Sequence, residues 1–171
     1  MSESFRRFYL EKRDVRSLMQ TLSRRLGIDT VRLFGSKPNV EVFETSKSRV
    51  YIINGAPLVA SVEEEVFPTL FFKDYLTSLP VVYVDMGAIP HICNGADVMA
   101  PGVRIVNEDF EENELVLVVD ERNKMPIAVS KSLVNAEALR KLRRGRVLKT
   151  LHYVGDDIWK IAREARIKKS I

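Results

Sequence analysis

The sequence is poor in the residues that build covalent or metal-bound frameworks. It contains one cysteine, Cys93, and two histidines among 171 residues. A single cysteine cannot form an intramolecular disulfide, and His91 and His152 have no cysteine or histidine neighbour at ligand spacing. We therefore expect no disulfide and no metal site. A chain without disulfide pairing is typical of a reducing compartment, so we expect a cytoplasmic protein.

Long apolar runs and nucleotide-binding or metalloprotease motifs are also missing. No apolar stretch approaches the roughly 18 residues of a membrane span, and the N-terminus lacks the apolar region of a signal peptide. There is no GxxxxGK[ST], GxGxxG or HExxH motif, so we expect no catalytic residues and no cofactor. The content of 46% hydrophobic and 29% charged residues is that of an ordinary globular protein and excludes disordered and collagen-like classes.

Charge is present but segregated along the chain. Residues 140–171 carry eleven Lys or Arg against three acids, whereas residues 81–139 carry four against ten. This asymmetry indicates a surface that faces a polyanion near the C-terminal end. Charge alone leaves open the alternative of a basic tail that only keeps the protein soluble.

The first 79 residues read as a small α+β unit. A helix over 14–26 carries one apolar stripe, with Asp14 as its N-cap and Gly27 as its end. Turn residues such as Asn54-Gly55 separate four strands rich in β-branched and aromatic residues. A second helix from Phe67 to Ser78 has Pro68 in its first turn. The four strands are expected at 31–35, 40–45, 49–55 and 57–61.

The second half has a different sequence pattern, which predicts many short strands at close spacing. This pattern predicts a closed or nearly closed small barrel. Pro101-Gly102 breaks one strand pair, and Asn135 caps a short helix. Asp156 or Asp157 caps a final helix, on which Trp159 is expected to pack against the barrel. Strands are expected at 81–85, 97–106, 114–120, 126–134 and 145–154, and short helices at 87–94 and 135–142.

Several separated blocks in this half resemble the PUA domain (pseudouridine synthase and archaeosine transglycosylase). They are Asp85-x-Gly87-Ala88, Gly95-Ala96-Asp97-Val98-Met99-x-Pro101-Gly102, Pro126-Ile-Ala-Val129, and Gly145-Arg-Val-Leu with His152-Tyr153. Upstream, Phe67-Pro68-Thr69-Leu70 and Leu79-Pro80 resemble the malignant T-cell-amplified sequence family, which is similar to one half of the translation factor ligatin.

That resemblance implies a fold and a function. The fold is α+β: an N-terminal pre-PUA domain at 1–79, a PUA pseudobarrel with short helices at 80–155, and a basic C-terminal helix or tail at 156–171. The implied function is non-catalytic RNA binding in translation, on the small ribosomal subunit or a tRNA, with a separate initiation-factor-like protein partner. The alternative is an RNA-binding specificity subunit of a modification enzyme, and a third class, a small RNA enzyme, has little support.

The candidate site lies around Gly95-Ala96-Asp97. From the residues alone, this loop either offers backbone N–H groups to an RNA phosphate or base, or is the C-terminal turn of a helix. The resemblance implies a cleft there, and the basic run beside the last strand would supply guanidinium groups that match phosphate. The cleft residues are Gly95, Ala96, Asp97, Met99, Pro101 and Gly102, and the charged residues are Lys131, Arg143, Arg144, Arg146 and Lys149.

Three isolated residues have simpler interpretations. His152 is expected to be a structural hydrogen-bonding residue and Cys93 a buried thiol. Asp156-Asp157 is interpreted as a helix-capping pair before a catalytic one.

Overall fold

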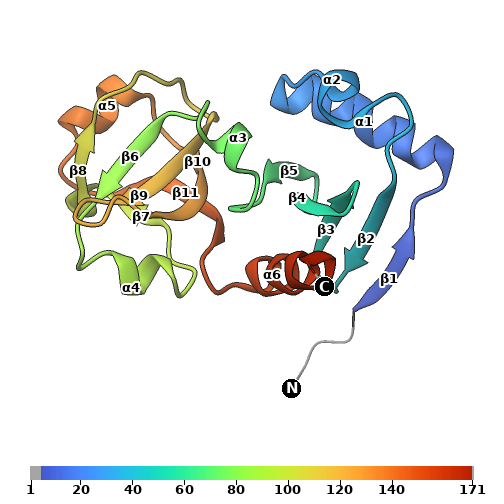
Figure 1. The fold of residues 1–171 in the computed structure, drawn as a ribbon. Helices are drawn as coiled ribbons and strands as arrows, with labels where there is room; N and C mark the ends of the chain where they lie inside the picture. Colours follow the sequence, from blue (N-terminus) through green and yellow to red (C-terminus); the bar gives the residue numbers. More distant parts are fainter. Residues whose placement is uncertain (1–4, 171) are drawn as a thin grey trace.

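Two β-sheets stand side by side in the computed structural model, which describes residues 5–170 (Figure 1). The first is a five-stranded antiparallel sheet in the order β1-β2-β3-β4-β5. The second has six strands in the order β7-β11-β10-β9-β6-β8, with β6 parallel to β9. The strands are β1 Arg6–Tyr9, β2 Val40–Glu44, β3 Ser48–Ile53, β4 Ala56–Val62, β5 Glu65–Pro68, β6 Val81–Val84, β7 Val98–Met99, β8 Val103–Val106, β9 Leu115–Asp120, β10 Pro126–Ser132 and β11 Arg146–Tyr153.

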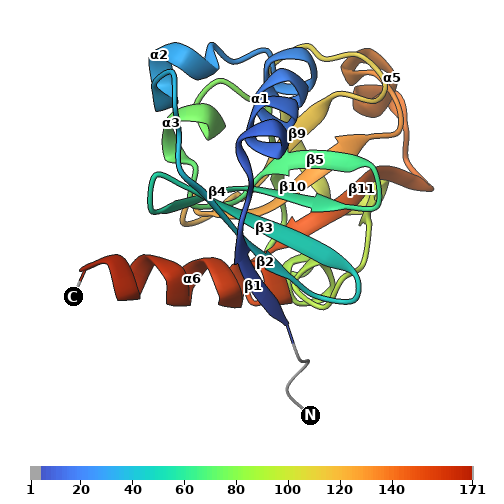
Figure 2. The same ribbon diagram turned by 90° about the vertical axis from the view of Figure 1, so that its right-hand side faces the viewer.

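Helices cover both faces of the five-stranded sheet. The two N-terminal helices lie on one face, and the last helix lies along the other (Figures 1 and 2). Alternation along the strands separates these faces, since Val42 packs with the N-terminal helices and Phe43 with the opposite side. The helices are α1 Lys12–Leu26, α2 Thr30–Phe34, α3 Lys73–Leu76, α4 Ile89–Ile92, η1 Ala100–Gly102, α5 Ala136–Lys141 and α6 Asp157–Ser170.

The first half corrects three expectations from the sequence. Residues 31–35 are not a strand, because Asp29 caps α2 by accepting the Arg32 N–H at 3.1 Å. The predicted helix from Phe67 is wrong over its first part: Phe67 and Pro68 end β5, paired with Ala60 and Val59. Asp14 is not the N-cap, because Glu11 holds that position and α1 begins at Lys12, so Asp14 lies in the first turn of the helix.

Other local predictions in this half are confirmed. Gly27 ends α1 in the left-handed region at φ 66°. Asn54 and Gly55, with φ of 50° and 84°, form the β3–β4 turn.

The six-stranded sheet closes around its own core, as its sequence pattern predicts. Its two edge strands, β7 and β8, are joined by the single turn η1, so the edges of the sheet meet at this point. Val82, Val118 and Leu148 are fully buried in the centre of the barrel. Asn135 caps α5, as expected, by accepting the Ala138 N–H at 2.8 Å.

His152 fastens the two sheets to each other. Its fully buried ring, on β11, accepts the Leu70 N–H at Nε2, 3.1 Å away, and donates from Nδ1 to Asp156. Asp156 also accepts the Trp159 N–H at 2.7 Å and thereby caps α6. His152 is therefore the structural hydrogen-bonding residue that the sequence predicts, held as the neutral tautomer with its proton on Nδ1.

The final helix does not dock chiefly on the barrel, which corrects the expectation for Trp159. Instead α6 packs mainly on β3 and β4, burying Ile158, Ala162 and Ala165. The Trp159 ring lies 6.2 Å from that of Phe71.

Candidate nucleic-acid interface

The loop after α4 is a closed helix end. The Gly95 N–H donates to the Ile92 carbonyl at 3.0 Å, and the Ala96 N–H to the His91 carbonyl at 3.0 Å. This pair of bonds is a Schellman motif, with Gly95 in the left-handed region at φ 94°. The expectation that this loop offers these two N–H groups to RNA is therefore wrong, because the helix end already uses them.

Asp97 fixes the loop to the last strand of the barrel. Its Oδ1 accepts the Thr150 N–H at 2.9 Å, and its Oδ2 accepts from Arg146 at 2.8 Å. The Thr150 hydroxyl donates to the Ala96 carbonyl at 2.9 Å. Asp97 is thus a brace that also orients Arg146, whose side chain remains 62% exposed. A guanidinium has five N–H donors, so Arg146 keeps donors for a ligand.

The opposite wall is formed by the turn between β6 and α4. Asp85 Oδ1 accepts the Ala88 N–H at 3.0 Å, and Arg104 donates to Asp85 Oδ2 at 3.3 Å. A Cβ added to Gly102 would lie 3.1 Å from the Ala88 methyl group, so η1 and this turn approach each other as closely as a glycine allows. The Asp85 N–H, which donates to the Gly102 carbonyl, holds them together.

A groove of about 440 Å³ runs between these walls. Its volume lies in the range of known ligand pockets. The lining is largely apolar, and its two carboxylates are already hydrogen-bonded. Of the predicted cleft residues, all but Gly95 line it; the lining is Asp85, Gly87, Ala88, His91, Ile92, Ala96, Asp97, Val98, Met99, Pro101 and Gly102.

The three predicted arginines do not line this groove, but their backbone runs beside its η1 side. The Gly145 carbonyl accepts the Ala100 N–H at 2.9 Å, so the segment that carries Arg143 and Arg144 runs beside η1. Arg146 pairs with Met99 across the β7–β11 ladder. Arg143 and Arg144 are exposed and make no ion pair or hydrogen bond with any residue between 5 and 170. We call Arg143, Arg144 and Arg146 the rim arginines.

The two predicted lysines lie elsewhere. Lys131 and Lys149 are paired directly between β10 and β11, so their side chains leave the same face of the sheet. Lys131 Nζ donates to Glu65 Oε1, on β5, at 2.6 Å. That face is therefore turned toward the five-stranded sheet, whereas Arg146 and Thr150 face the groove loop. The structure does not bring either lysine to the groove.

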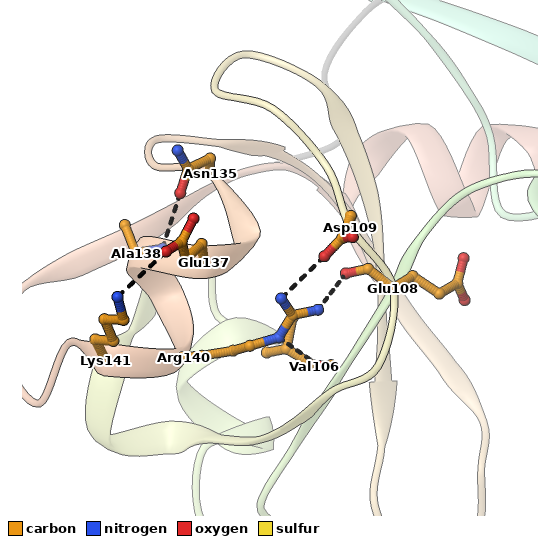
Figure 3. A network of polar contacts seen from close by, with 8 residues as sticks. All are labelled: Val106, Glu108, Asp109, Asn135, Glu137, Ala138, Arg140 and Lys141. Carbon is orange, nitrogen blue, oxygen red and sulfur yellow. Dashed lines mark hydrogen bonds and ion pairs between the residues drawn. The ribbon is translucent and has the colours of Figure 1, made fainter.

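Arg140, at the start of the basic stretch, has a structural role. Its guanidinium donates to the carbonyls of Val106 and Glu108 and to the Asp109 carboxylate, at 3.0, 3.1 and 2.9 Å (Figure 3). It thereby ties the beginning of the acidic loop 107–114 to α5. Neighbouring Lys141 pairs with Glu137. Arg140 and Lys141 are therefore engaged within the protein, whereas Arg143 and Arg144 have no ion-pair partner among the described residues.

Sequence reasoning missed part of the groove lining. Asp85, Gly87 and Ala88 were visible as a motif, but only the closed barrel brings them opposite 96–102. His91 is exposed on the same wall, and no sequence signal marks it. Cys93 is half-buried rather than buried, and burial raises the pKa of its thiol, which disfavours the nucleophilic thiolate. Within residues 5–170 no group of three His, Cys, Asp or Glu side chains could hold a metal ion.

The fold and groove define a PUA-domain protein, and comparison with known proteins agrees. A family profile described as "PUA domain" matches residues 80–154, and one described as "Domain of unknown function (DUF1947)" matches residues 6–74. A PUA domain protein (APE0525) from Aeropyrum pernix K1, solved as a tartrate complex, superimposes with a TM-score of 0.73 at 26% identity, over 95% of this chain and 94% of that one.

Two relatives are similar over most of their length. The uncharacterized protein MJ1432 of Methanocaldococcus jannaschii is 38% identical over 158 residues, which are 90% of this chain and 95% of that protein. Translation machinery-associated protein 20 of Eremothecium gossypii is 27% identical over 135 residues, 74% of this chain and 75% of that protein. The chain belongs to this family of two-part PUA proteins, which also includes Malignant T-cell-amplified sequence 1 of Danio rerio. No helix in the described part of the chain is long and apolar enough to cross a membrane.

Proposed function

We propose that this chain is a non-catalytic RNA-binding protein of the translation machinery. Its groove holds unstacked nucleotides of ribosomal or transfer RNA, and the rim arginines bind the adjoining phosphates. The proposal places it in the cytoplasm, on the small ribosomal subunit or a tRNA. The name of the Eremothecium relative, a translation machinery-associated protein, supports the assignment to translation.

The observation that carries the proposal is the placement of unused guanidinium donors beside an open apolar groove. Arg143 and Arg144 have no partner in the part of the chain that the structure describes, and Arg146 is oriented by Asp97 and keeps further N–H donors. Single-stranded RNA needs an apolar surface for the faces of its bases and cations for its phosphates. Arginine meets the second need well, because its planar fork matches the oxygens of a phosphate.

The carboxylates of the groove suit a base better than a phosphate. Asp85 and Asp97 each hold a backbone N–H and an arginine, so a phosphate inside the groove would meet their negative charge. Their remaining lone pairs can accept hydrogen bonds from amino groups on a base or from a ribose hydroxyl. Bases therefore belong in the groove and phosphates at its rim.

A salt titration with a matched control tests this proposal. The experiment measures the binding of a short fluorescein-labelled single-stranded RNA to the full chain by fluorescence anisotropy. Each phosphate contact with a single strand adds about 0.7 to the log–log salt slope. The variant Arg143→Gln/Arg144→Gln/Arg146→Gln should lower affinity at least tenfold and reduce the slope by about 2.

The control is Lys12→Gln/Arg16→Gln/Lys37→Gln, which removes the same charge from the region before β2. We expect RNA affinity to change little in this variant. Equal losses in both variants, or no loss in the rim variant, would contradict the proposal. Co-purification then separates translation from the alternative: small ribosomal subunits support the proposal, whereas an RNA-modification enzyme supports a role as its specificity subunit.

A further inference from the structure

A second cavity lies on the other half of the molecule, far from the PUA groove in sequence. It is a groove of about 850 Å³ between α1, α2 and the segment 35–40 that leads into β2. Its apolar lining is aliphatic and includes one methionine; the apolar residues are Leu10, Val15, Met19, Val31, Pro38 and Val40. We call it the α1–α2 groove.

The walls of the α1–α2 groove are braced in position. Leu10 donates its N–H to the Val40 carbonyl at 2.9 Å, which joins the end of β1 to the start of β2. The side chain of Asn54 holds both ends of the intervening segment, because it donates to the Phe34 carbonyl and accepts the Asn39 N–H, each at 2.9 Å. The groove is therefore preformed, which lowers the entropic cost of binding.

The charged residues that line this groove are all basic. Lys12, Arg16 and Lys37 line it, and no acidic residue does. All three are exposed and make no ion pair or hydrogen bond with any residue that the structure describes. The surrounding segment 5–40 carries nine Lys or Arg against three acids. An occupant of the groove must therefore bring negative charge.

The polar lining distinguishes a nucleic acid from an acidic protein as the occupant. The PUA groove contains two carboxylates, Asp85 and Asp97, that can accept hydrogen bonds from a base or a ribose hydroxyl, whereas the α1–α2 groove has no carboxylate in its lining. Aliphatic side chains with a flexible methionine are typical of grooves that take the apolar face of a helical peptide. Val31, which lines the groove, is 64% exposed and offers such a peptide further contact area.

We propose that the α1–α2 groove docks an acidic amphipathic helix of a partner protein. The apolar face of that helix lies on Val15, Met19 and Val31, and its carboxylates pair with Lys12, Arg16 and Lys37. This site does not depend on the RNA-binding proposal, because it uses other residues on another part of the chain. It gives the region before the PUA domain a function of its own: recruitment of a protein while the PUA groove holds RNA.

Titration with a synthetic peptide tests the inference on the full chain. The peptide has Leu at helical positions i, i+3, i+4 and i+7 and Asp or Glu between them. Methyl NMR spectra should show shifts at Val15, Met19 and Val31, and little change at Met99 or Val98 in the PUA groove. The variant Lys12→Gln/Arg16→Gln/Lys37→Gln should weaken binding about tenfold, since three exposed charge pairs are lost.

Two controls separate charge at the groove from charge elsewhere. The variant Arg13→Gln/Arg24→Gln/Arg25→Gln removes as many charges from α1 but none from the groove lining, and should bind the peptide as the wild type does. Val31→Ser, at an exposed position, should weaken binding several-fold without loss of stability.

Three outcomes would overturn the inference. The peptide fails to bind at millimolar concentration, it binds both triple variants equally, or a single-stranded RNA displaces it from the same methyl groups. In the last case the α1–α2 groove is an RNA site. Circular dichroism of each variant checks that the fold is intact.

Discussion

The PUA groove and the α1–α2 groove both lie beside cations that have no ion-pair partner among residues 5–170, yet their walls are held in place differently. The PUA groove is braced by carboxylates, since Asp85 and Asp97 hold its walls, and its arginines stand at one rim. The α1–α2 groove is braced by a neutral amide, Asn54, and its cations line an aliphatic surface that holds no acid. Positive charge alone therefore does not identify the ligand of a groove. The other side chains that line the groove, carboxylates in one case and aliphatic groups in the other, distinguish the two.

The contrast also explains how one small chain could bind two partners at once. The grooves belong to different sheets, and the interface between the sheets is held by apolar packing and by His152. Because the two sites share no lining residue, a change at one should leave the other intact. The following predictions test how far the two regions are independent.

The largest effect is expected where the two regions meet. His152→Ala leaves the Leu70 N–H without its acceptor, removes one of the donors to the Asp156 carboxylate, and opens a cavity in a fully buried site. We expect a loss of about 3 kcal/mol in the free energy of unfolding. Urea unfolding monitored by Trp159 fluorescence and by hydrogen exchange in β10 should still show one transition. A loss below about 1 kcal/mol would show that this joint contributes little to stability, and two separate transitions would show that the remaining packing does not couple the regions without it.

A second test compares the two braces. Asp97→Ala removes the acceptor for the Thr150 N–H and for the Arg146 guanidinium. It should lower the free energy of unfolding by about 2 kcal/mol. Asn54→Ala removes neutral hydrogen bonds at an exposed turn and should cost about 1 kcal/mol. Asp97→Asn, which keeps an oxygen for Thr150, is the control and should lie between Asp97→Ala and wild type. Equal costs for Asp97→Ala and Asn54→Ala would remove the distinction between charged and neutral bracing.

A third test narrows the PUA groove by one methyl group. Gly102→Ala places a Cβ 3.1 Å from that of Ala88, so the two walls must separate by a few tenths of an ångström. We expect a stability cost of about 1 kcal/mol and a several-fold loss of RNA affinity, with peptide binding unchanged. The double variant Gly102→Ala/Ala88→Gly should recover part of both losses, because it restores the space. If the double variant instead loses more stability and RNA affinity than Gly102→Ala alone, the contact between residues 102 and 88 is not the cause of these losses.

The smallest effect concerns stability at acid pH. It should differ between the β9–β10 turn and the β3–β4 turn. The N–H groups of Asn123 and Met125 donate to the Asp120 carboxylate in the β9–β10 turn, and they lower its pKa. The stabilisation is therefore complete above the unfolded-state pKa of about 3.9 and is lost as pH falls through the lower folded-state value. The β3–β4 turn, braced by Asn54, has no such dependence.

Asp120→Asn gives the measurement for this acid effect. The variant should be less stable than wild type at neutral pH, and the difference should shrink as the pH is lowered through the acid range. Unfolding by urea at several pH values would show it. A constant difference at all pH values would contradict the assignment.

Much of the second half could be predicted from its sequence. Gly95 ends a helix, and Asn135 and Asp156 cap the helices that follow them, as their sequence positions predict. These signals are reliable because each acts on backbone groups only three or four residues away. The positions of the short strands along the chain follow from the spacing of the turn residues. The sequence does not reveal the parallel pairing of β6 with β9. It also does not reveal that β7 and β8 meet, which places Asp85 across the groove from residues 96–102.

The errors lie where long-range pairing decides between two local readings. Residues 31–35 have the composition of a strand, but they find no partner strand and Val31 remains exposed. Pro68 suits a helix start, but it ends β5 opposite Val59. For the candidate site, Lys131 and Lys149 fit the charge pattern of an RNA binder, yet strand alternation turns them to the other face. Charge along a sequence does not specify the face on which it lies.

Crosslinking tests most directly which surface holds RNA. A single-stranded RNA containing photoreactive nucleotides is bound to the full chain and irradiated, and the modified residues are mapped by mass spectrometry. The account predicts crosslinks within 85–102 and at 143–146, with their loss in Arg143→Gln/Arg144→Gln/Arg146→Gln. Crosslinks that concentrate in residues 10–40, or around Lys131 and Lys149, would contradict it.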